Sequence, residues 1–217
     1  MPTGAGREED LTLNAEMAVP SLVEQAYAVA RQSGFALTRQ EAGPDRPSAC
    51  LPGVGRFLAM LAAGCQGGTI AELGTGAGIG AAWIASAMPA DCMLVTAELD
   101  AGLAAAAAGL LARDARVQVL AGDARVVLAP HAPFDLIFAD SGVRDAAAFA
   151  ALSDMLRPGG RIVMDDLTPV LALPADSPLR QSDIKRSLLA GQDSLTWTEV
   201  VLPDLANSLL VGTRRTA

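Results

Sequence analysis

Residues 69–80 read TIAELGTGAGIG, a short apolar run followed by alternating glycines and the beginning of an alanine-rich stretch. This order is typical of a strand, a tight turn and the start of a helix. Gly74, Gly76 and Gly78 allow a sharp turn and let a ligand lie against the main chain. A helix beginning near Ile79 would add free N–H groups. The stretch is therefore predicted to hold a polar ligand.

The spacing of these glycines narrows the choice of ligand. The dinucleotide fingerprint G-x-G-x-x-G needs a glycine at its sixth position, but counted from Gly74 that position is Ile79. Counted from Gly76 it is Ala81, which leaves only the looser fingerprint that ends in alanine. The fuller pattern is E-x-G-x-G-x-G, with Glu72 at the end of the strand. An ordinary strand-to-helix turn is the alternative, so the rest of the chain has to decide.

Length and composition indicate one globular domain. The chain has 217 residues and a mass of 22.2 kDa, with 51% hydrophobic residues and a mean hydropathy of +0.34. We expect residues 1–64 to form N-terminal helices and residues 65–217 to form the core. The net charge of −8 and the pI of about 4.6 would repel a phosphate backbone, so no nucleic-acid partner is expected.

Cysteine usage and the first residues indicate a cytoplasmic protein. Cys50, Cys65 and Cys92 have no C-x-x-C spacing and are interpreted as small buried side chains in a reducing compartment. The N-terminus MPTGAGREED is expected to be a frayed tail and lacks the basic and apolar regions of a signal peptide. No apolar run approaches the roughly 18 residues that a membrane span needs, so no membrane association is expected.

The chain alternates between apolar runs and helical runs. Amphipathic helices are predicted around residues 22–30 and 54–61, before the glycine stretch. Strands are predicted at residues 69–73, 93–98, 117–121, 135–139, 161–164, 196–201 and 208–212, and further helices at residues 79–88, 101–112, 146–156 and 182–189. This alternation predicts an α/β fold, a Rossmann-like, seven-stranded, mainly parallel sheet with helices on both faces. Ligands of such sheets lie outside the carboxyl ends of the strands.

Acidic residues stand at or just past the ends of the first five predicted strands. They are Glu72, Glu98, Asp123, Asp140 and the pair Asp165 and Asp166. Because these strand ends meet at one edge of the sheet, their repeated placement favours a ligand site over a solvated face. Glu98 is expected to accept hydrogen bonds from ribose hydroxyls, with capping of the next helix as the alternative. Asp100 is assigned to that cap.

The stretches TAELD (96–100), AGDAR (121–125), FDLIFADS (134–141) and LRPGGRIVMDD (156–166) follow the glycine loop in that order. In this order and spacing the chain resembles the class I S-adenosylmethionine-dependent methyltransferases. Within that class it resembles the cation-dependent small-molecule O-methyltransferases related to the catechol and caffeoyl-coenzyme A enzymes. The resemblance covers residues 69–166 and the trailing strands, and it implies S-adenosylmethionine and Mg²⁺ as cofactors.

The resemblance also implies roles for individual residues. The cofactor site would comprise Glu72, Gly74, Thr75, Gly76, Gly78, Gly80, Glu98, Asp123, Ala124 and Asp140. Within it, Asp123 and Ala124 would contact the adenine, and Gly80 takes the place where many relatives hold a serine against the methionine carboxylate. Asp140 would be the catalytic residue and would share the Mg²⁺ ion with Asp165 and Asp166.

The chemistry of methyl transfer supports a cation at these three carboxylates. Transfer from a sulfonium is an in-line displacement, and a divalent cation would lower the pKa of an acceptor hydroxyl and fix its approach. Without a cation, Asp140, Asp165 and Asp166 would repel one another. The alternative is that Asp140 orients the sulfonium while Asp165 and Asp166 open the next loop.

Two features depart from the resembled family. Asp165 and Asp166 stand where those enzymes have an Asp-Asn pair, and Val143 stands where the catechol type has a lysine. Arg144 follows, but a guanidinium stays protonated and is a poor base. His131 is interpreted as an exposed loop residue, so the general base is unassigned.

The sequence therefore predicts transfer of a methyl group to a hydroxyl of a small molecule, assisted by a divalent cation. The alternatives are a metal-independent methyltransferase acting on nitrogen, carbon or a macromolecule, and a non-catalytic domain that binds the cofactor. The apolar faces of the N-terminal helices and the habit of the related enzymes predict a homodimer, although ordinary core packing also explains those faces.

Overall fold

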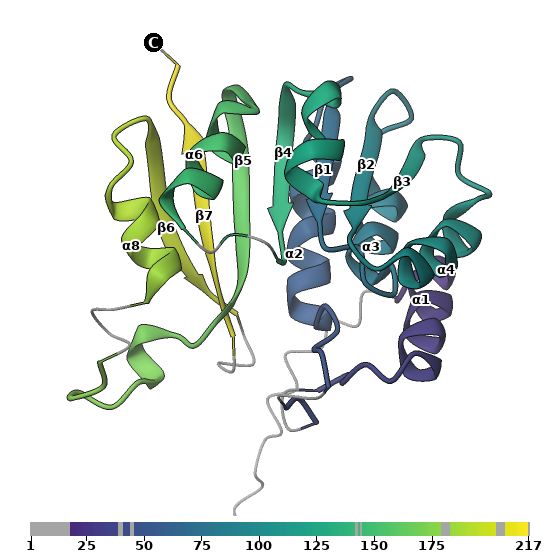
Figure 1. Cartoon of the computed structure of the whole chain (residues 1–217), viewed down its shortest axis with the longest axis horizontal. Helices are drawn as coiled ribbons and strands as arrows, with labels where there is room; N and C mark the ends of the chain where they lie inside the picture. Colours follow the sequence, from purple (N-terminus) through teal and green to yellow (C-terminus); the bar gives the residue numbers. More distant parts are fainter. Residues whose placement is uncertain are drawn as a thin grey trace, which may run out of the picture.

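The structure of the protein is a computed structural model that describes residues 18–38, 41–43, 46–141, 143, 145–178, 183–202 and 207–216 (Figure 1). The predicted N-terminal tail at residues 1–10 lies outside the described residues, as do Arg144 and Ser182, the first residue of the last predicted helix.

Seven strands form one sheet in the order β3-β2-β1-β4-β5-β7-β6 (Figure 1). The strands are β1 (Thr69–Leu73), β2 (Met93–Glu98), β3 (Val117–Ala121), β4 (Phe134–Ala139), β5 (Leu156–Leu167), β6 (Leu195–Val201) and β7 (Ser208–Arg214). Strands β1 to β5 pair in parallel, and β7 runs antiparallel to both β5 and β6. The predicted mainly parallel sheet is confirmed. Its order reverses between β1 and β4, where α/β sheets bind ligands.

Helices cover both faces of the sheet, as predicted. On one face lie α1 (Ser21–Gln32), α2 (Pro52–Ala63), α3 (Ile79–Ala87) and α4 (Ala101–Leu111), and on the other lie α5 (Ala124–Val127), α6 (Ala146–Asp154) and α8 (Ile184–Ala190). Two short 3-10 turns, η1 (Ala129–His131) and η2 (Val170–Ala172), follow α5 and β5. Along β4 the side chains alternate between the two cores, with Leu136 and Phe138 in one and Ile137 in the other.

The N-terminal helices are part of the core. Both α1 and α2 pack against α3. The approach of α2 depends on Gly55, because a Cβ there would lie 2.1 Å from the indole ring of Trp83. The side chains that gave the two helices their apolar faces, including Val23, Leu58 and Leu61, are buried within the subunit. Core packing therefore accounts for most of the surface that motivated the predicted dimer.

The largest differences from the sequence prediction are in strand β5, in helix α6 and in one additional helix. Strand β5 begins at Leu156 rather than at Arg161, because Leu156 already pairs with Phe134 before a shift in register. Helix α6 accordingly ends at Asp154. The short helix α5 was not predicted, since four residues are too few to show a helical period.

The segment between α1 and α2 runs along the carboxyl ends of the central strands, below the sheet in Figure 1. It is fixed by hydrogen bonds from Arg46 Nη2 to the carbonyl of Phe35 (3.0 Å) and from the Tyr27 hydroxyl to the carbonyl of Cys50 (3.1 Å). This path brings Phe35 over the glycine loop, where a Cβ on Gly76 would lie 3.3 Å from its ring.

Candidate active site

The loop between β1 and α3 has the left-handed backbone conformation at its glycines. The φ angle is 90° at Gly74, 52° at Gly76 and 86° at Gly78, values that residues with a side chain adopt only with strain. A Cβ on Gly74 would also lie 2.5 Å from Ser141 Oγ. The glycines therefore let the loop turn sharply against the end of β4.

Glu98, at the end of β2, holds this loop in place. Its Oε2 accepts a hydrogen bond from the Gly76 N–H (2.8 Å), and its Oε1 accepts one from the Asp100 N–H (3.0 Å). Asp100 in turn caps α4, accepting a hydrogen bond from the Leu103 N–H (2.9 Å), so the predicted cap is confirmed. The contact of Glu98 with the glycine loop was not predicted.

A cavity of about 560 Å³ opens between the loop and the ends of β2 and β3. This volume lies within the range of sites for small organic ligands, roughly 300 to 1,000 Å³. The residues that line it include Gly74, Glu98, Leu99, Asp123, Ala124, Ser141 and Asp145. Four of the predicted cofactor residues are thus brought together around one space.

Asp123 contributes to this cavity and also begins α5. Its carboxylate accepts a hydrogen bond from the Arg125 N–H (3.0 Å) and pairs with the Arg125 guanidinium (2.7 Å). These hydrogen bonds from Arg125 hold the pKa of Asp123 below its usual range. The capping role was not predicted, and contact with an adenine stays a prediction.

A smaller cavity of about 20 Å³ also borders Gly74. Its lining includes Phe35, Ser48, Ala49 and Cys50 from the segment between α1 and α2, together with Glu72, Thr75, Gly76, Gly80 and Asp140. Gly78 is not among the lining residues of these two cavities. A Cβ on Gly78 would instead lie 3.3 Å from Leu110 of α4, so this glycine serves the packing of α3 on α4.

Gly80 faces the core of the site. A Cβ at this position would lie 2.2 Å from Glu72 Oε1 and 3.2 Å from the Phe138 ring. The carboxyl group of Glu72 therefore occupies the direction in which a serine side chain would start. This contact explains why the position is a glycine in this chain.

Asp140 follows β4, and Asp165 and Asp166 lie near the end of β5. The three acids share one edge of the sheet, but the two acids of β5 differ in exposure. Asp165 is buried, whereas the next residue, Asp166, is exposed at an irregularity in the pairing of β5 with β7. Asp165 Oδ1 accepts hydrogen bonds from Asn207 Nδ2 (2.5 Å) and from the Asp166 N–H (2.6 Å). Asp166 has a φ of 64°, a strained value of the kind that concentrates at functional sites.

Comparisons with known proteins agree with this geometry. The sequence profile of the protein-L-isoaspartate(D-aspartate) O-methyltransferase family matches residues 28–172. A Mycobacterium avium (strain 104) protein, provisionally named an O-methyltransferase, is 33% identical over 171 residues, which cover 75% of this chain and 72% of the relative. The chain belongs to the S-adenosylmethionine-dependent O-methyltransferases. The family predicted from the sequence is confirmed.

The methyltransferase is also similar to a catechol O-methyltransferase in sequence and to two solved O-methyltransferases in structure. The catechol O-methyltransferase of Niastella koreensis is 36% identical over 125 residues, covering 54% of this chain and 57% of the relative. The Bacillus cereus O-methyltransferase solved with SAH has a TM-score of 0.69 at 24% identity, covering 93% of this chain and 94% of that one. TomG of Streptomyces achromogenes, solved with SAM, has a TM-score of 0.67 at 24% identity, covering 92% of each chain. At these identities the structural likeness shows the shared fold.

Glu72 is the most unusual carboxyl group of the methyltransferase. Only 1% of the residue is exposed, and its Oε2 accepts a hydrogen bond from the Thr96 hydroxyl (2.6 Å), which itself lies 2.5 Å from the Thr75 hydroxyl. Burial raises the pKa of Glu72 to about 8, and the charge of Glu98 adds to the increase. The carboxyl group is therefore mostly protonated at neutral pH.

Burial and mutual repulsion also shift the pKa values of Asp140, which follows β4, and of Asp165, near the end of β5. Burial raises the pKa of Asp140 well above its ordinary value, and the charges of Asp165 and Asp166 raise it further. Burial, followed by the charge of Asp166, raises the pKa of Asp165 to about 6. The positive charge of Lys185 acts in the opposite direction on both Asp140 and Asp165.

The predicted Mg²⁺ site is not assembled in this arrangement. Among the residues that the structure describes, no group of three or more His, Cys, Asp or Glu side chains is placed to bind a metal ion. Asp165 Oδ1 is already engaged by Asn207, and the Asp166 side chain is exposed. The donor chemistry suits a hard cation, but the geometry does not fit a preformed site for one.

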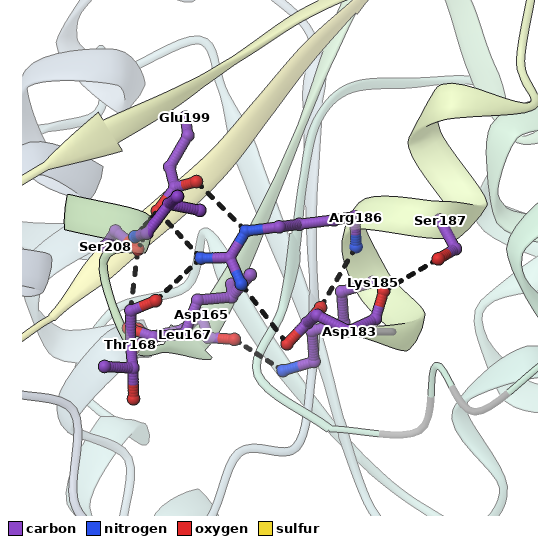
Figure 2. Close-up of polar contacts among 10 residues, drawn as sticks. Asp165, Leu167, Thr168, Asp183, Lys185, Arg186, Ser187, Glu199 and Ser208 are labelled. Atoms are coloured by element: carbon purple, nitrogen blue, oxygen red, sulfur yellow. Dashed lines mark hydrogen bonds and ion pairs between the residues drawn. The ribbon is translucent and has the colours of Figure 1, made fainter. Parts of the chain in front are cut away.

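Basic residues of α8 fix the end of β5 (Figure 2). Arg186 Nε and Nη2 donate hydrogen bonds to Glu199 (3.0 and 2.8 Å), and Nη2 also donates to the carbonyl of Thr168 (2.7 Å). Ser208 Oγ donates to Glu199 Oε1 (2.6 Å). Next to Arg186, Lys185 Nζ donates to the backbone carbonyl of Asp165 (2.5 Å). Helix α8 is thus tied to the strand end that carries the acids.

Several residues of the active site were missed by the sequence prediction. Thr96 lies opposite Glu72 in the parallel register of β1 and β2, a contact that follows once the two strands are known to be neighbours. Asn207 and Lys185 come from parts of the chain more than 15 residues after Asp165, and local spacing gives no sign that they return to it. The contribution of Phe35 was not visible either, because a loop path is not encoded by periodicity.

Proposed function

We propose that this enzyme transfers the methyl group of S-adenosylmethionine to a hydroxyl oxygen of a small molecule. The observation that supports it is the cavity of about 560 Å³ at the glycine loop, which is of a size for the cofactor, with Asp140 lining a smaller space that also borders Gly74. The net charge of −8 disfavours a nucleic acid as the acceptor.

The residues around the cavities suggest how the cofactor lies. Its adenosine would occupy the larger cavity, with the ribose near Glu98 and the adenine near Asp123 and Ala124. Its methionine end would follow the glycine loop toward the smaller cavity, past Gly74 and the residues Glu72, Thr75, Gly76 and Gly80. The N-terminus of α3, with Gly78 as its N-cap, would offer N–H groups to a carboxylate.

When bound, S-adenosylmethionine supplies a methyl group on a positively charged sulfur. The chain's own residues then have to align the acceptor oxygen with that methyl group and exclude water. Asp140, which lines the smaller cavity, is placed to orient the acceptor by accepting a hydrogen bond from its hydroxyl. Phe35 and Cys50 cover the site with apolar surface.

One relative and the matching family suggest two different acceptors, and a single assay can distinguish them. The name of the Niastella koreensis relative specifies catechol, whereas the name of the matching family profile specifies isoaspartyl residues of proteins. We expect the purified enzyme to methylate catechol with equimolar formation of S-adenosylhomocysteine, and to leave an isoaspartyl peptide unmodified. Mass spectrometry of both acceptors measures this. Methylation of the peptide alone would contradict the proposal, and cofactor binding without any turnover would favour a non-catalytic domain.

A homodimer remains part of the proposal, although most of the apolar surface of α1 and α2 that suggested it is buried within the subunit. Met60 on α2 keeps 59% of its surface exposed and supports a contact through this helix. We expect light scattering at micromolar concentration to give twice the chain mass of 22.2 kDa, and Met60→Glu to favour the monomer. Met93→Glu, at the exposed start of β2, is the matched control. A monomeric parent would rule out the dimer.

The predicted cytoplasmic location is also kept as a proposal. All three cysteines, Cys50, Cys65 and Cys92, are free and buried, as expected for a reducing compartment. In the described part of the chain, every helix is too short or too polar to cross a membrane.

A divalent cation is the one predicted cofactor that the geometry does not favour. The carboxylates of Asp140, Asp165 and Asp166 still concentrate negative charge at one edge of the sheet, so the hypothesis that Mg²⁺ binds there can be tested directly. If it binds, Mg²⁺ will raise the melting temperature of the parent enzyme and this increase will vanish in Asp165→Asn. The same measurement decides the inference below.

A further inference from the structure

Lys185 is the only lysine in a sequence that has 16 lysines and arginines together. Apart from His131, every other basic side chain of the sequence is an arginine. The two are not interchangeable, because an ammonium is a compact point charge with three freely oriented donors, whereas a guanidinium is a planar fork. The position of the single ammonium group therefore calls for an explanation.

The structure places this ammonium group near Asp140, at the end of β4, and Asp165, near the end of β5. Lys185 lies in the first turn of α8, is partly buried and donates a hydrogen bond from Nζ to the backbone carbonyl of Asp165 (Figure 2). Its charge acts on the carboxyl groups of Asp140 and Asp165. Lys185 therefore faces the negative end of the active site rather than solvent alone.

Among the described residues, no carboxylate forms an ion pair with Lys185. Arg186, the next residue, forms ion pairs with Glu199 (2.8 Å) and Asp183 (3.5 Å). Within the described residues Lys185 forms no ion pair, and its one hydrogen bond goes to a carbonyl group. Its positive charge is thus available to the surrounding carboxylates and to a ligand.

Helix α8 holds the ammonium in this position before any ligand binds. Arg186 joins the helix to Glu199 of β6 and to the carbonyl of Thr168 after β5. Asp183 caps the helix by accepting a hydrogen bond from the Arg186 N–H (3.1 Å). Because α8 is anchored in this way, the ammonium group is already in position before a ligand binds.

We propose that Lys185 is the resident cation of this active site, supplying the positive charge that the carboxylates of Asp140, Asp165 and Asp166 require, so that methyl transfer proceeds without a divalent metal ion. Lys185 acts as a positioning residue, keeping Asp140 and Asp165 in the arrangement that orients the acceptor. The inference rests on the proposed O-methyl transfer and concerns how its acidic edge is neutralised.

The geometry favours the ammonium over Mg²⁺ at this edge. Mg²⁺ demands near-octahedral oxygen ligation at about 2.1 Å, and the described residues contain no group of acidic side chains placed for it. Asp165 Oδ1 is held by Asn207 and by the Asp166 N–H, which already fix its direction. The ammonium group of Lys185, in contrast, is held by one hydrogen bond to the Asp165 carbonyl group, which leaves its other two N–H groups free to donate.

The test compares Lys185→Met, Lys185→Arg and the parent in Mg²⁺ and in EDTA, by melting temperature, calorimetry with S-adenosylhomocysteine and catechol turnover. Arg113→Met removes one exposed positive charge after α4 and is the matched control. We expect parent and control to behave alike with Mg²⁺ and with EDTA. Lys185→Met should lose at least about tenfold in kcat, keep its affinity for S-adenosylhomocysteine, and gain a melting temperature that rises with Mg²⁺. Lys185→Arg should show an intermediate kcat without the Mg²⁺ response.

A second measurement covers the case in which Lys185→Met does not fold. Lysine labelled with carbon-13 at Cε gives one lysine resonance in the intact parent, since the chain has one lysine. That resonance should not move when Mg²⁺ is added. A Mg²⁺-dependent shift, loss of parent turnover in EDTA, or a Lys185→Met variant with parental kcat and no Mg²⁺ response would each overturn the inference. If the parent binds S-adenosylhomocysteine but methylates no hydroxyl, the proposed function fails while the Mg²⁺ and resonance measurements still decide the role of Lys185.

Discussion

Replacing Glu98 with alanine is expected to weaken the binding of S-adenosylhomocysteine by about 10- to 150-fold, measured by calorimetry. The estimate corresponds to about 1.5 to 3 kcal/mol, the contribution of hydrogen bonds to a charged acceptor. Two effects act together. The variant would lose the proposed ribose contact, and it would release the Gly76 N–H that Glu98 Oε2 now holds at 2.8 Å.

The matched control for this prediction is Asp100→Ala. Asp100 caps α4 but does not line the larger cavity, so its loss should lower the free energy of unfolding by about 1 kcal/mol while the cofactor affinity stays the same. Glu98→Gln should be intermediate, because a carboxamide offers one oxygen where Gly76 and Asp100 each require an acceptor. Unchanged affinity in Glu98→Ala would remove Glu98 from the cofactor site. Binding of a nicotinamide cofactor instead would overturn the assignment of the whole cavity.

Local patterns were sufficient to predict the sheet and the glycine loop that borders both cavities. The alternating glycines predicted a sharp turn, and the structure makes it with left-handed backbone at Gly74, Gly76 and Gly78. The acids at the strand ends do gather at one edge, because parallel strands direct their carboxyl ends to the same side. Asp100 was identified as a cap from its place before an alanine-rich helix. Each of these inferences depends on residues close together in the sequence.

Contacts between distant segments could not be predicted in this way. The sequence assigned Glu98 to ribose without revealing that both of its oxygens hold backbone N–H groups. It grouped Asp165 with Asp166 as joint metal ligands, whereas the structure buries the first and exposes the second. It also gave no reason to connect Lys185 with the acids, since the path of the chain from β5 to α8 brings them together.

A second large effect is expected at Glu72, whose replacement by glutamine should stabilise the enzyme at alkaline pH. The pKa of Glu72 is about 8 in the folded protein against an ordinary value of 4.5, chiefly because of burial. The folded state therefore holds a proton that the unfolded chain releases. Between about pH 4.5 and pH 8 this difference lowers the free energy of unfolding by about 1.4 kcal/mol per pH unit, or roughly 3 to 5 kcal/mol in total.

Glutamine suits this position because it can replace the protonated acid. Its carbonyl oxygen can accept the hydrogen bond that the Ala81 N–H gives to Glu72, and its amide can donate to the Thr96 hydroxyl, which then donates to Thr75. The variant should match the parent near pH 5 and exceed its free energy of unfolding by roughly 3 kcal/mol or more near pH 8. Urea denaturation at both pH values measures the difference.

The comparison with Asp165→Asn separates Glu72 from the acids at the end of β5. The pKa of Asp165 is raised only to about 6, so its contribution to the pH dependence has the same sign but is complete by that pH. Asp165→Asn should therefore reduce the slope of the curve below pH 6, where Glu72 still contributes, and leave the decline between pH 6 and pH 8 intact, whereas Glu72→Gln should reduce the slope up to about pH 8. If Glu72→Gln kept the parental slope above pH 6, the proton held by the folded protein would lie elsewhere, and Asp140, whose pKa burial also raises, would be the next carboxyl group to replace.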